Sequence, residues 1–170
     1  MRVTLHTVTA QDYPAFHDAM QPTLRAARLN DRRFRRTGLS LADADSLVPK
    51  VLAFASEPTT NAEAERWVRE QIGEFPEPGI WWAFRQYAPF VHAPTGGAWS
   101  FGPRPSYRAS PLKAGFGDPV DAAPTLVRRY LEGFGPASIA DIAQFCLLSR
   151  PLVRAAAEAL GDELLQLEGP

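Results

Sequence analysis

The amino-acid sequence lacks the features that several classes of protein require. No apolar run approaches the ~18 residues that a membrane-spanning helix needs. The first residues do not show the charged and then apolar pattern of a secretory signal. The single cysteine, Cys146, excludes an internal disulfide framework and a zinc site made of several cysteines. These absences favour a cytoplasmic protein with no membrane partner.

Sequence signatures of common catalytic sites are also absent. The chain has no Gly-x-Ser-x-Gly nucleophile motif and no phosphate loop that ends in Gly-Lys-Ser or Gly-Lys-Thr. Its three histidines do not have the spacing of metal ligands, and no carboxylate pair accompanies them in sequence. We therefore predict no metal, no cofactor and no catalytic residue in this chain.

A general excess of positive charge is missing as well. The 18 lysines and arginines face 19 acidic residues, so the formal net charge is −1. Domains that bind nucleic acid are often clearly basic, and this balance counts against such a partner. Arginines are nevertheless concentrated at Arg25, Arg28, Arg32, Arg33, Arg35 and Arg36. Such a run either binds phosphate, which suits the forked guanidinium group, or is a solvated helix face and loop.

Apolar periodicity predicts three helices followed by an extended hairpin, and this pattern begins twice. In the first copy, we expect helices near residues 47–55, 60–72 and 80–87. Two β-prone pieces follow at residues 90–93 and 98–101, with Thr95-Gly96-Gly97 as the turn between them and a last extended piece around Tyr107.

The second copy restarts after Pro124. A helical stripe runs from Leu126 to Phe134, and Ser138 and Ser149 are positioned to cap two further helices, the last of which ends at Gly161. An extended segment then begins, but no returning strand follows it. Because an unpaired edge strand is a liability, we expect another chain or a missing segment to complete this second hairpin.

The pattern divides the chain into four parts. Residues 1–38 are a lead-in, with a strand at residues 2–8, a helix that Pro22 should kink or split, and a polar loop from Asn30 to Gly38. Residues 39–112 form the first three-helix unit and residues 124–170 the second. Residues 113–123, rich in Gly, Pro and Ala, are predicted to be a linker.

These elements predict a mainly helical α+β fold with two tandem winged-helix units, in which a β-wing follows a helix-turn-helix and the second wing is incomplete. The usual ligand of this fold is double-stranded DNA, because a helix fits the major groove. The candidate DNA contacts lie on the two third helices, on the first wing and in the arginine run: Arg85, Gln86, Arg150, Arg154, Arg104, Arg108, Arg32, Arg33, Arg35 and Arg36. The alternative is that these charges only keep the surface soluble.

Three segments carry a resemblance to a known family. Arg2-Val3-Thr4-Leu5-His6-Thr7-Val8 resembles the Arg-Gly-Thr-Leu-His-Leu-Val signature of the bacterial winged helix DNA-binding domain family, which includes the DNA glycosylases that unhook interstrand crosslinks. Residues 126–141 and the aromatic, proline-rich wing around Trp99 and Arg104 also look like this family. The chain is similar to the central and third winged-helix portions of family members.

The resemblance implies a DNA-repair protein or a fragment of one. The family's catalytic motif, Gln-apolar-Gln or Gln-apolar-Asp, lies upstream of the matched region, and no such triplet occurs here in the matching context. We therefore expect DNA binding without base excision. His6 is the motif histidine; it either acts near a DNA lesion or is a partly buried residue that joins the first strand to the core.

Other functions remain open at this point. A stand-alone transcriptional regulator could have the same fold, but it would need to dimerise to present paired half-sites. A protein-interaction module could use a winged helix without DNA, which the slightly negative net charge permits. A glycosylase with its catalytic residues within this chain is the fourth possibility.

Overall fold

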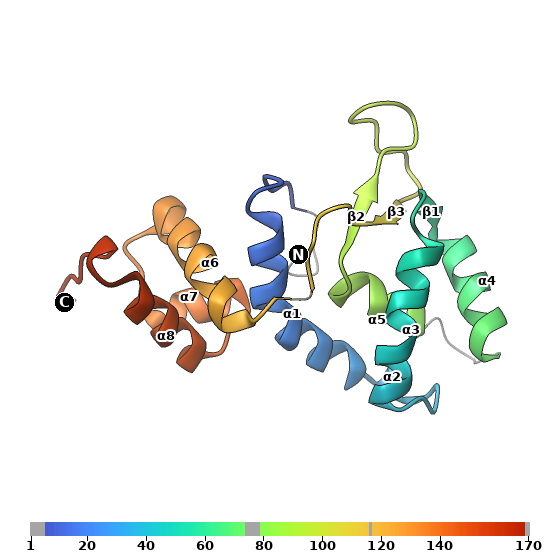
Figure 1. The fold of residues 1–170 in the computed structure, drawn as a ribbon, viewed down its shortest axis with the longest axis horizontal. Coiled ribbons are helices and arrows are strands. Elements are labelled where there is room, and N and C mark those ends of the chain that lie inside the picture. Colours follow the sequence, from blue (N-terminus) through green and yellow to red (C-terminus); the bar gives the residue numbers. More distant parts are fainter. Residues whose placement is uncertain (1–5, 74–78, 116, 169–170) are drawn as a thin grey trace. The chain divides into compact units, whose positions relative to one another are not determined.

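The computed structural model describes residues 6–73, 79–115 and 117–168 (Figure 1). The elements are α1 (Tyr13–Leu29), α2 (Arg32–Arg35), α3 (Leu41–Phe54), β1 (Thr59–Thr60), α4 (Asn61–Ile72), α5 (Ile80–Tyr87), β2 (Phe90–Ala93), β3 (Ser106–Ala109), α6 (Pro119–Phe134), α7 (Ile139–Cys146), α8 (Arg150–Leu160) and the 3-10 turn η1 (Gly161–Glu163). The expectation of a mainly helical α+β chain is confirmed. Among these residues, no helix has both the length and the apolar character needed to cross a lipid bilayer.

The chain forms two compact units, which are described separately. Unit 1 comprises Met1–Leu24 and Leu112–Pro170, and unit 2 comprises Arg25–Pro111. Helix α1 begins in unit 1, and its last residues belong to unit 2. This helix continues through Pro22 without a break, contrary to a split helix, and the ring of Pro22 is exposed on its surface.

The three longer helices of unit 2 are α3, α4 and α5, and side-chain caps fix where the first two begin. Ser40 and Asp43 form a reciprocal capping box at the start of α3. Thr60 and Glu63 do the same for α4, and the Thr60 amide donates to Glu63 Oε2 at 2.8 Å. Such caps satisfy amides that would otherwise have no partner in the first turn. Because Thr60 also ends β1, strand and helix follow one another without a loop.

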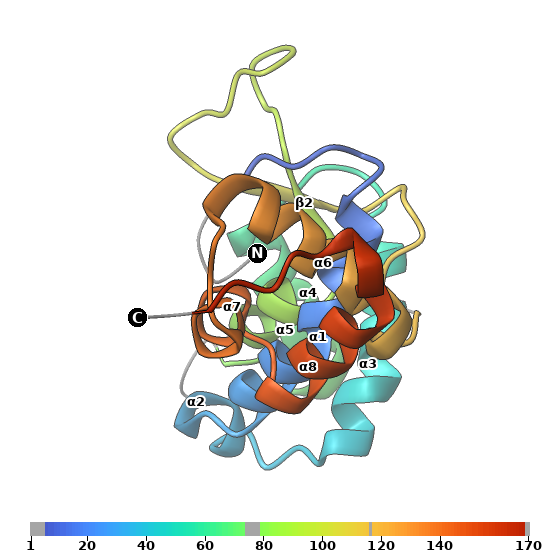
Figure 2. The same cartoon turned by 90° about the vertical axis from the view of Figure 1, so that its left-hand side faces the viewer.

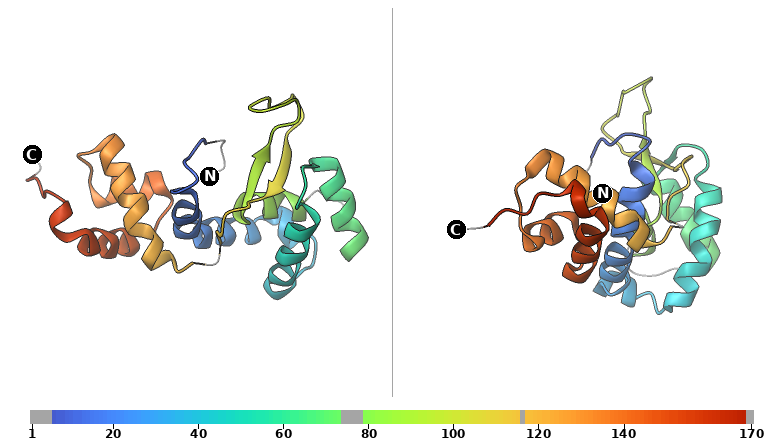
Figure 3. Two further views of the ribbon diagram at one scale, coloured as in Figure 1. Left: turned by 45° about the horizontal axis from the view of Figure 1, so that its top comes forward. Right: turned by 60° about the vertical axis from the view of Figure 1, so that its left-hand side comes forward.

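The sheet of unit 2 has the strand order β1-β3-β2, so β3 lies between two antiparallel neighbours. Tyr107 on β3 stands opposite Thr59 on one side and His92 on the other. The hairpin between β2 and β3 is visible in Figure 3. We call its connection, residues 94–105, the hairpin loop.

The predicted strand at residues 98–101 is wrong, and the returning strand is Ser106–Ala109. The backbone closes on itself earlier, because the Thr95 amide donates to the Ser100 carbonyl at 2.9 Å. Trp99 within this turn has φ +62°, a conformation that no strand residue adopts. Tyr107, expected in a last extended piece, belongs to the strand that pairs with β2.

The core of unit 2 lies between its helices and the sheet. Its largest fully buried side chains come from α2, α3, α4 and α5: Phe34, Val51, Val68, Ile80, Trp81, Phe84 and Tyr87. Phe34 explains a second correction, since residues 30–38 are not simply a polar loop. Asp31 caps α2 by accepting from the Arg33 amide at 2.8 Å, and the buried Phe34 ring holds this single turn on the core.

Unit 1 is built from α6, α7 and α8, which pack on one another (Figure 2), together with the first part of α1. Its core includes Met20, Val127, Ile142, Cys146 and Val153, each no more than 2% exposed. Cys146 is therefore a packing residue, as its place on an apolar helix face suggested.

Residues 119–123, expected to be part of a linker, instead form the beginning of α6. Asp118 accepts from the Val120 amide at 2.8 Å, and Pro119 occupies the first helical position, where its missing amide leaves no bond unmade. The capping signals of Ser138 and Ser149 mark the starts of α7 and α8 as predicted.

Two other expected extended segments in unit 1 do not form strands among the described residues. Residues 164–168 follow η1 without pairing, and Leu165 is 85% exposed. Of the strand predicted at residues 2–8, positions 2–5 lie outside the described residues, and residues 6–8 have no regular structure.

Buried carboxylates hold the parts of unit 1 together. Asp18 on α1 is 8% exposed and accepts hydrogen bonds from the amides of Gly115 and Gly117, the second at 3.0 Å. Asp12 is equally buried and lies 3.2 Å from Nε of Arg129 on α6. The Asp18 side chain therefore fixes the segment before α6 to α1, because it accepts both backbone hydrogen bonds.

Replacing Asp18 by alanine should lower the free energy of unfolding by about 1–3 kcal/mol, because two amides lose their acceptor. Urea unfolding followed by circular dichroism measures the change. Glu158→Ala, an exposed position on α8, is the matched control and should change stability by less than about 0.5 kcal/mol. Equal effects of the two substitutions would show that the Asp18 contacts do not stabilise the unit.

Candidate nucleic-acid interface

Helix α5, the last of the three longer helices of unit 2, is mostly buried. Five of its eight residues are in the core, and Trp81 is fixed there by its indole Nε1, which donates to Asn61 Oδ1 at 2.9 Å. The Trp81 ring also meets Phe90 and Tyr107 edge to face, at centroid distances of 5.1 and 5.8 Å. The helix therefore presents only Trp82, Arg85 and Gln86 as partly exposed side chains.

Arg85, a candidate base contact, is engaged within the unit. Its Nη1 donates to the Tyr107 hydroxyl at 2.9 Å, and its guanidinium carbon lies 5.7 Å from the centre of the Tyr107 ring. Gln86 has its Oε1 buried. Arg85 thus fastens α5 to β3, and its assignment as a DNA contact stays a prediction.

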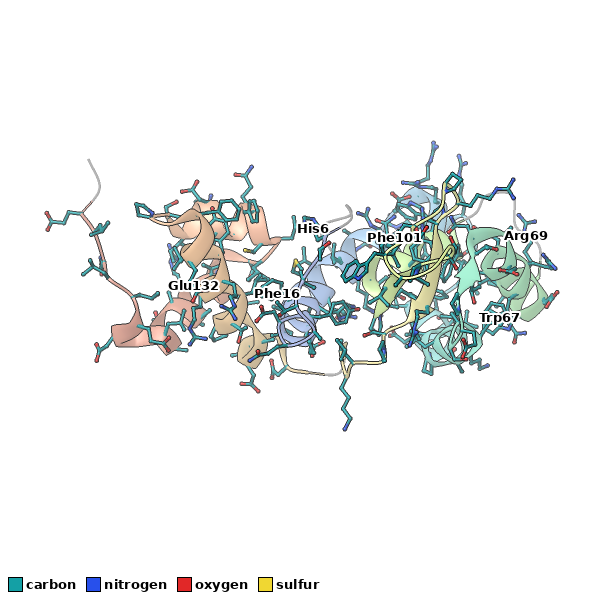
Figure 4. All side chains as sticks on the ribbon, turned by 90° about the horizontal axis from the view of Figure 1, so that it is seen from above. His6, Phe16, Trp67, Arg69, Phe101 and Glu132 are labelled. Atoms are coloured by element: carbon teal, nitrogen blue, oxygen red, sulfur yellow. The ribbon has the colours of Figure 1, made fainter. Side chains whose placement is uncertain are left out.

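A carboxylate on α4 lies near this arginine. Burial raises the pKa of Glu65, while the positive charges of Arg69 and Arg85 act in the opposite direction. Its Oε2 atom is buried and has no hydrogen-bond partner among the described residues. Figure 4 shows Arg69 and Trp67 on the same helix. Glu65 is therefore a partly desolvated charge beside α5.

Arginines of α1 and α2 surround the exposed part of Trp82. The guanidinium carbon of Arg33 lies 3.6 Å from the centre of the indole ring, and that of Arg28 lies 5.0 Å away. Burial lowers the pKa of Arg28, and the nearby Asp31 partly offsets this. Both cations are held against an aromatic face, which is a favourable contact in itself.

The other arginines of α2 and its C-terminal cap are exposed to solvent. These are Arg32, Arg35 and the cap residue Arg36, and Arg35 donates to Asn30 Oδ1 at 3.0 Å. Gly79 makes the close packing of α2 on α5 possible, because a Cβ atom there would lie 2.5 Å from the carbonyl oxygen of Arg33. The exposed guanidinium groups are therefore carried on a helical turn that packs closely against the start of α5.

The hairpin carries positive charge and no negative charge. From Gly79 to Gly117 the sequence contains no Asp or Glu, and its cations are Arg85, Arg104, Arg108 and Lys113. Arg104 is exposed in the hairpin loop, whereas Arg108 on β3 is half-buried. Burial, aided by Arg85, lowers the pKa of His92 on β2, whose ring lies 4.6 Å from that of Tyr107.

In unit 1, the two candidate arginines of α8 are exposed, Arg150 in the first position and Arg154 one turn later. Other arginines of this unit are paired: Arg128 binds Glu163, and Arg129 binds Asp12 and Glu132 (labelled in Figure 4). His6 is exposed rather than partly buried.

Besides the arginine surfaces, the hollow of unit 2 and the possible metal ligands are places where a ligand could bind. No group of three potential metal ligands occurs in the described ranges. A shallow cavity of about 310 Å³ lies between the end of α3 and α4, where Phe54 stacks on Trp67 at 5.0 Å. Its charged lining residues are Glu63, Arg66 and Glu70, and the two carboxylates outweigh the one cation as surroundings for a phosphate.

Sequence reasoning missed two features of this interface. The contact of Arg28 and Arg33 with Trp82 joins residues about fifty positions apart, and no local pattern predicts it. The absence of acidic residues from Gly79 to Gly117, in contrast, is visible in the sequence once charge is counted by segment.

A family model and a solved structure both match the chain. The AlkZ-like DNA glycosylase family matches residues 1–170, and the chain belongs to this family. The solved structure of Streptomyces sahachiroi DNA glycosylase AlkZ has a similar fold, with a TM-score of 0.75 and 21% sequence identity. The match covers 97% of this chain and 47% of that one, so the chain spans less than half the length of that protein. No curated protein matches the chain.

Glu65→Gln should raise the free energy of unfolding at about pH 7, because burial of the charged carboxylate opposes folding. A carboxyl group whose pKa is raised in the folded state destabilises above that pKa, and the penalty disappears as the pH falls through it. The gain should therefore vanish near pH 3, where an ordinary glutamate is protonated in both states. Urea unfolding at both pH values tests this, and Glu70→Gln on the exposed face of α4 is the control.

Proposed function

We propose that unit 2 is a winged helix that binds double-stranded DNA as part of a DNA-repair glycosylase of the crosslink-unhooking type. The order α3, β1, α4, α5, β2, β3 with the sheet order β1-β3-β2 supports the winged-helix assignment, because α4 and α5 then form the helix-turn-helix and the β2–β3 hairpin is the wing. Membership of the AlkZ-like family supports the link to repair.

The observation that carries the proposal is the charge of the wing. No acidic residue occurs between Gly79 and Gly117, and Arg104 is exposed at the projecting loop. A polyanion is attracted to such a surface through the release of counterions from its phosphates. The arginines of α2 extend the set of cations within the same unit, whereas Arg85 holds the helix in place.

In unit 1, we propose that α6, α7 and α8 form a second, winged-helix-like DNA contact. Helix α8 follows the short helix α7 and so corresponds to the third helix of such a unit. It carries the exposed Arg150 and Arg154. Another chain or a further segment would complete the wing that residues 164–168 do not form. The proposal assigns this chain DNA binding and assigns it no catalytic residue.

The wing should account for part of the salt dependence of duplex binding. Fluorescence anisotropy of a labelled duplex should show binding at micromolar or weaker Kd that weakens steeply with salt. Arg104→Ala should reduce the slope of log K against log salt by about 0.9, the value for one phosphate contact. Arg66→Ala, an exposed arginine beside Glu63 on α4, should leave the slope unchanged. Absence of binding at low salt contradicts the proposed function.

The contribution of unit 1 is separable from that of the wing. The double substitution Arg150→Glu and Arg154→Glu should weaken duplex binding by at least about tenfold, since two favourable phosphate contacts become repulsive. The same anisotropy titration measures it. Reversing the paired Arg128 to Glu is unsuitable as a control because it would break the contact with Glu163. Lys50→Glu on α3 is suitable, since Lys50 is exposed and belongs to neither cation set. An unchanged Kd for the double variant would confine DNA binding to unit 2.

A further inference from the structure

The hairpin loop exposes aromatic side chains at its tip. Trp99 is 81% exposed and Phe101 is 49% exposed, with only Ser100 between them. Large aromatic side chains contribute most to the stability of a protein when they are buried, so a highly exposed indole in a loop is unusual. Figure 1 shows the loop projecting beyond the strands that carry it, and Figure 4 labels Phe101 on it. The chain thus presents apolar surface where its own unit gives it no packing.

The backbone conformation at Trp99 is also unfavourable by itself. With φ +62°, Trp99 adopts the left-handed conformation that glycine or asparagine normally occupies, and a bulky residue there is an outlier. Such outliers cluster at functional sites, where the surrounding structure enforces them. An unused loop position would be expected to relax or to carry a smaller residue.

Hydrogen bonds hold the tip in this conformation. The Ser100 amide donates to the Gly97 carbonyl at 3.0 Å, and the Gly102 amide donates to Thr95 Oγ1 at 3.3 Å. Gly96 allows the closure, because a Cβ atom at this position would lie 2.7 Å from Ser100 Oγ. The indole is therefore presented by an ordered turn, which reduces the entropy lost when it binds.

The charge around the tip indicates which ligand it meets. Arg104 is the only charged residue of the hairpin loop, and the strands on either side add Arg108 but no acidic residue. Two aromatic rings beside an exposed guanidinium group match a ligand that alternates flat apolar surfaces with phosphates. Stacked bases on a phosphate backbone have this composition.

We propose that Trp99, with Phe101 beside it, inserts between base pairs of duplex DNA and makes this chain select weakly stacked steps. The inference rests on the proposed DNA-binding function and specifies how the wing uses it. Apolar side chains that enter from the minor groove partly unstack a base step, and the energy needed is least where the pairing is already disturbed. Arg104 binds a neighbouring phosphate, so affinity comes from the arginine and selectivity from the indole.

The test compares two duplexes of equal length, one fully paired and one with a single central mismatch flanked by thymines. The full chain should bind the mismatched duplex more tightly and should increase the permanganate reactivity of the flanking thymines, which reports unstacking. Trp99→Ala should reduce the mismatch-to-paired affinity ratio roughly tenfold, the size of one aromatic–base stack. Trp99→Phe should retain much of the ratio.

Two controls separate stacking from charge and from folding. Leu41→Ala removes an apolar side chain that is 51% exposed on α3 and should alter neither the ratio nor the permanganate pattern. Arg104→Ala should weaken binding to both duplexes by the same factor, so the mismatch-to-paired affinity ratio should not change. Circular dichroism of Trp99→Ala should match that of the unchanged chain, because the indole makes little contact with the fold.

The possible results separate the insertion of Trp99 from the proposed DNA binding. If the unchanged chain binds DNA but shows no mismatch preference or thymine unstacking, or if Trp99→Ala keeps both, the insertion is wrong and DNA binding stands. If the unchanged chain binds neither duplex at low salt, the proposed function and the insertion both fail.

Discussion

Tyr107 is the residue on which the arrangement of unit 2 depends. It lies on the central strand β3, where its hydroxyl accepts from Arg85 at 2.9 Å and its ring meets those of Trp81 and His92. One side chain thereby joins α5 to both strands of the hairpin. Because β3 is paired on both sides, the base of the hairpin cannot shift without breaking the sheet or moving α5. The position of the hairpin loop relative to α5 follows from this contact.

The same contact bears on which residues of unit 2 could take part in the proposed DNA binding. In a helix-turn-helix, the third helix usually supplies the base contacts. Here α5 is short and largely buried, and Arg85 is bound to Tyr107 and lies near the carboxylate of Glu65. Breaking these contacts to reach a base would leave buried polar groups unpaired. Among the candidate contacts of unit 2, the fully exposed arginines belong to the hairpin loop and to the segment of α2, which favours a contact led by the hairpin over one led by α5.

The sequence predicts the elements that are determined locally and misses those set by distant contacts. Apolar stripes and the hydroxyl caps at Thr60, Ser138 and Ser149 correctly locate helices, because capping bonds join residues two or three positions apart. Helix α2 was missed because so short a turn depends on the burial of Phe34 in the core, in addition to its Asp31 cap. The strand at residues 98–101 was predicted from β-prone residues, but the turn closed by Thr95 and Ser100 excludes it.

The sequence indicated which residues the candidate site contains, but only partly how their side chains are placed. Exposed Arg104, Arg150 and Arg154 follow from their places in the pattern. The engagement of Arg85 and the pairing of Arg28 and Arg33 with Trp82 do not, since both depend on which face of α5 is buried. A helical period indicates which residues share a face, but the opposing element decides whether a polar residue at the edge of that face finds a partner.

Net charge is a poor guide to the partner of this chain, because its acidic residues have local structural roles. Asp43, Glu63 and Asp141 accept hydrogen bonds from Ser40, Thr60 and Ser138 at helix starts, and these bonds lower the pKa of each carboxyl. Asp45 and Glu163 are paired with arginines. At physiological salt, exposed charges interact over only about 8 Å. A phosphate close to the hairpin loop therefore responds to Arg104 and to the absence of nearby acids in sequence far more than to the total of −1 for the whole chain.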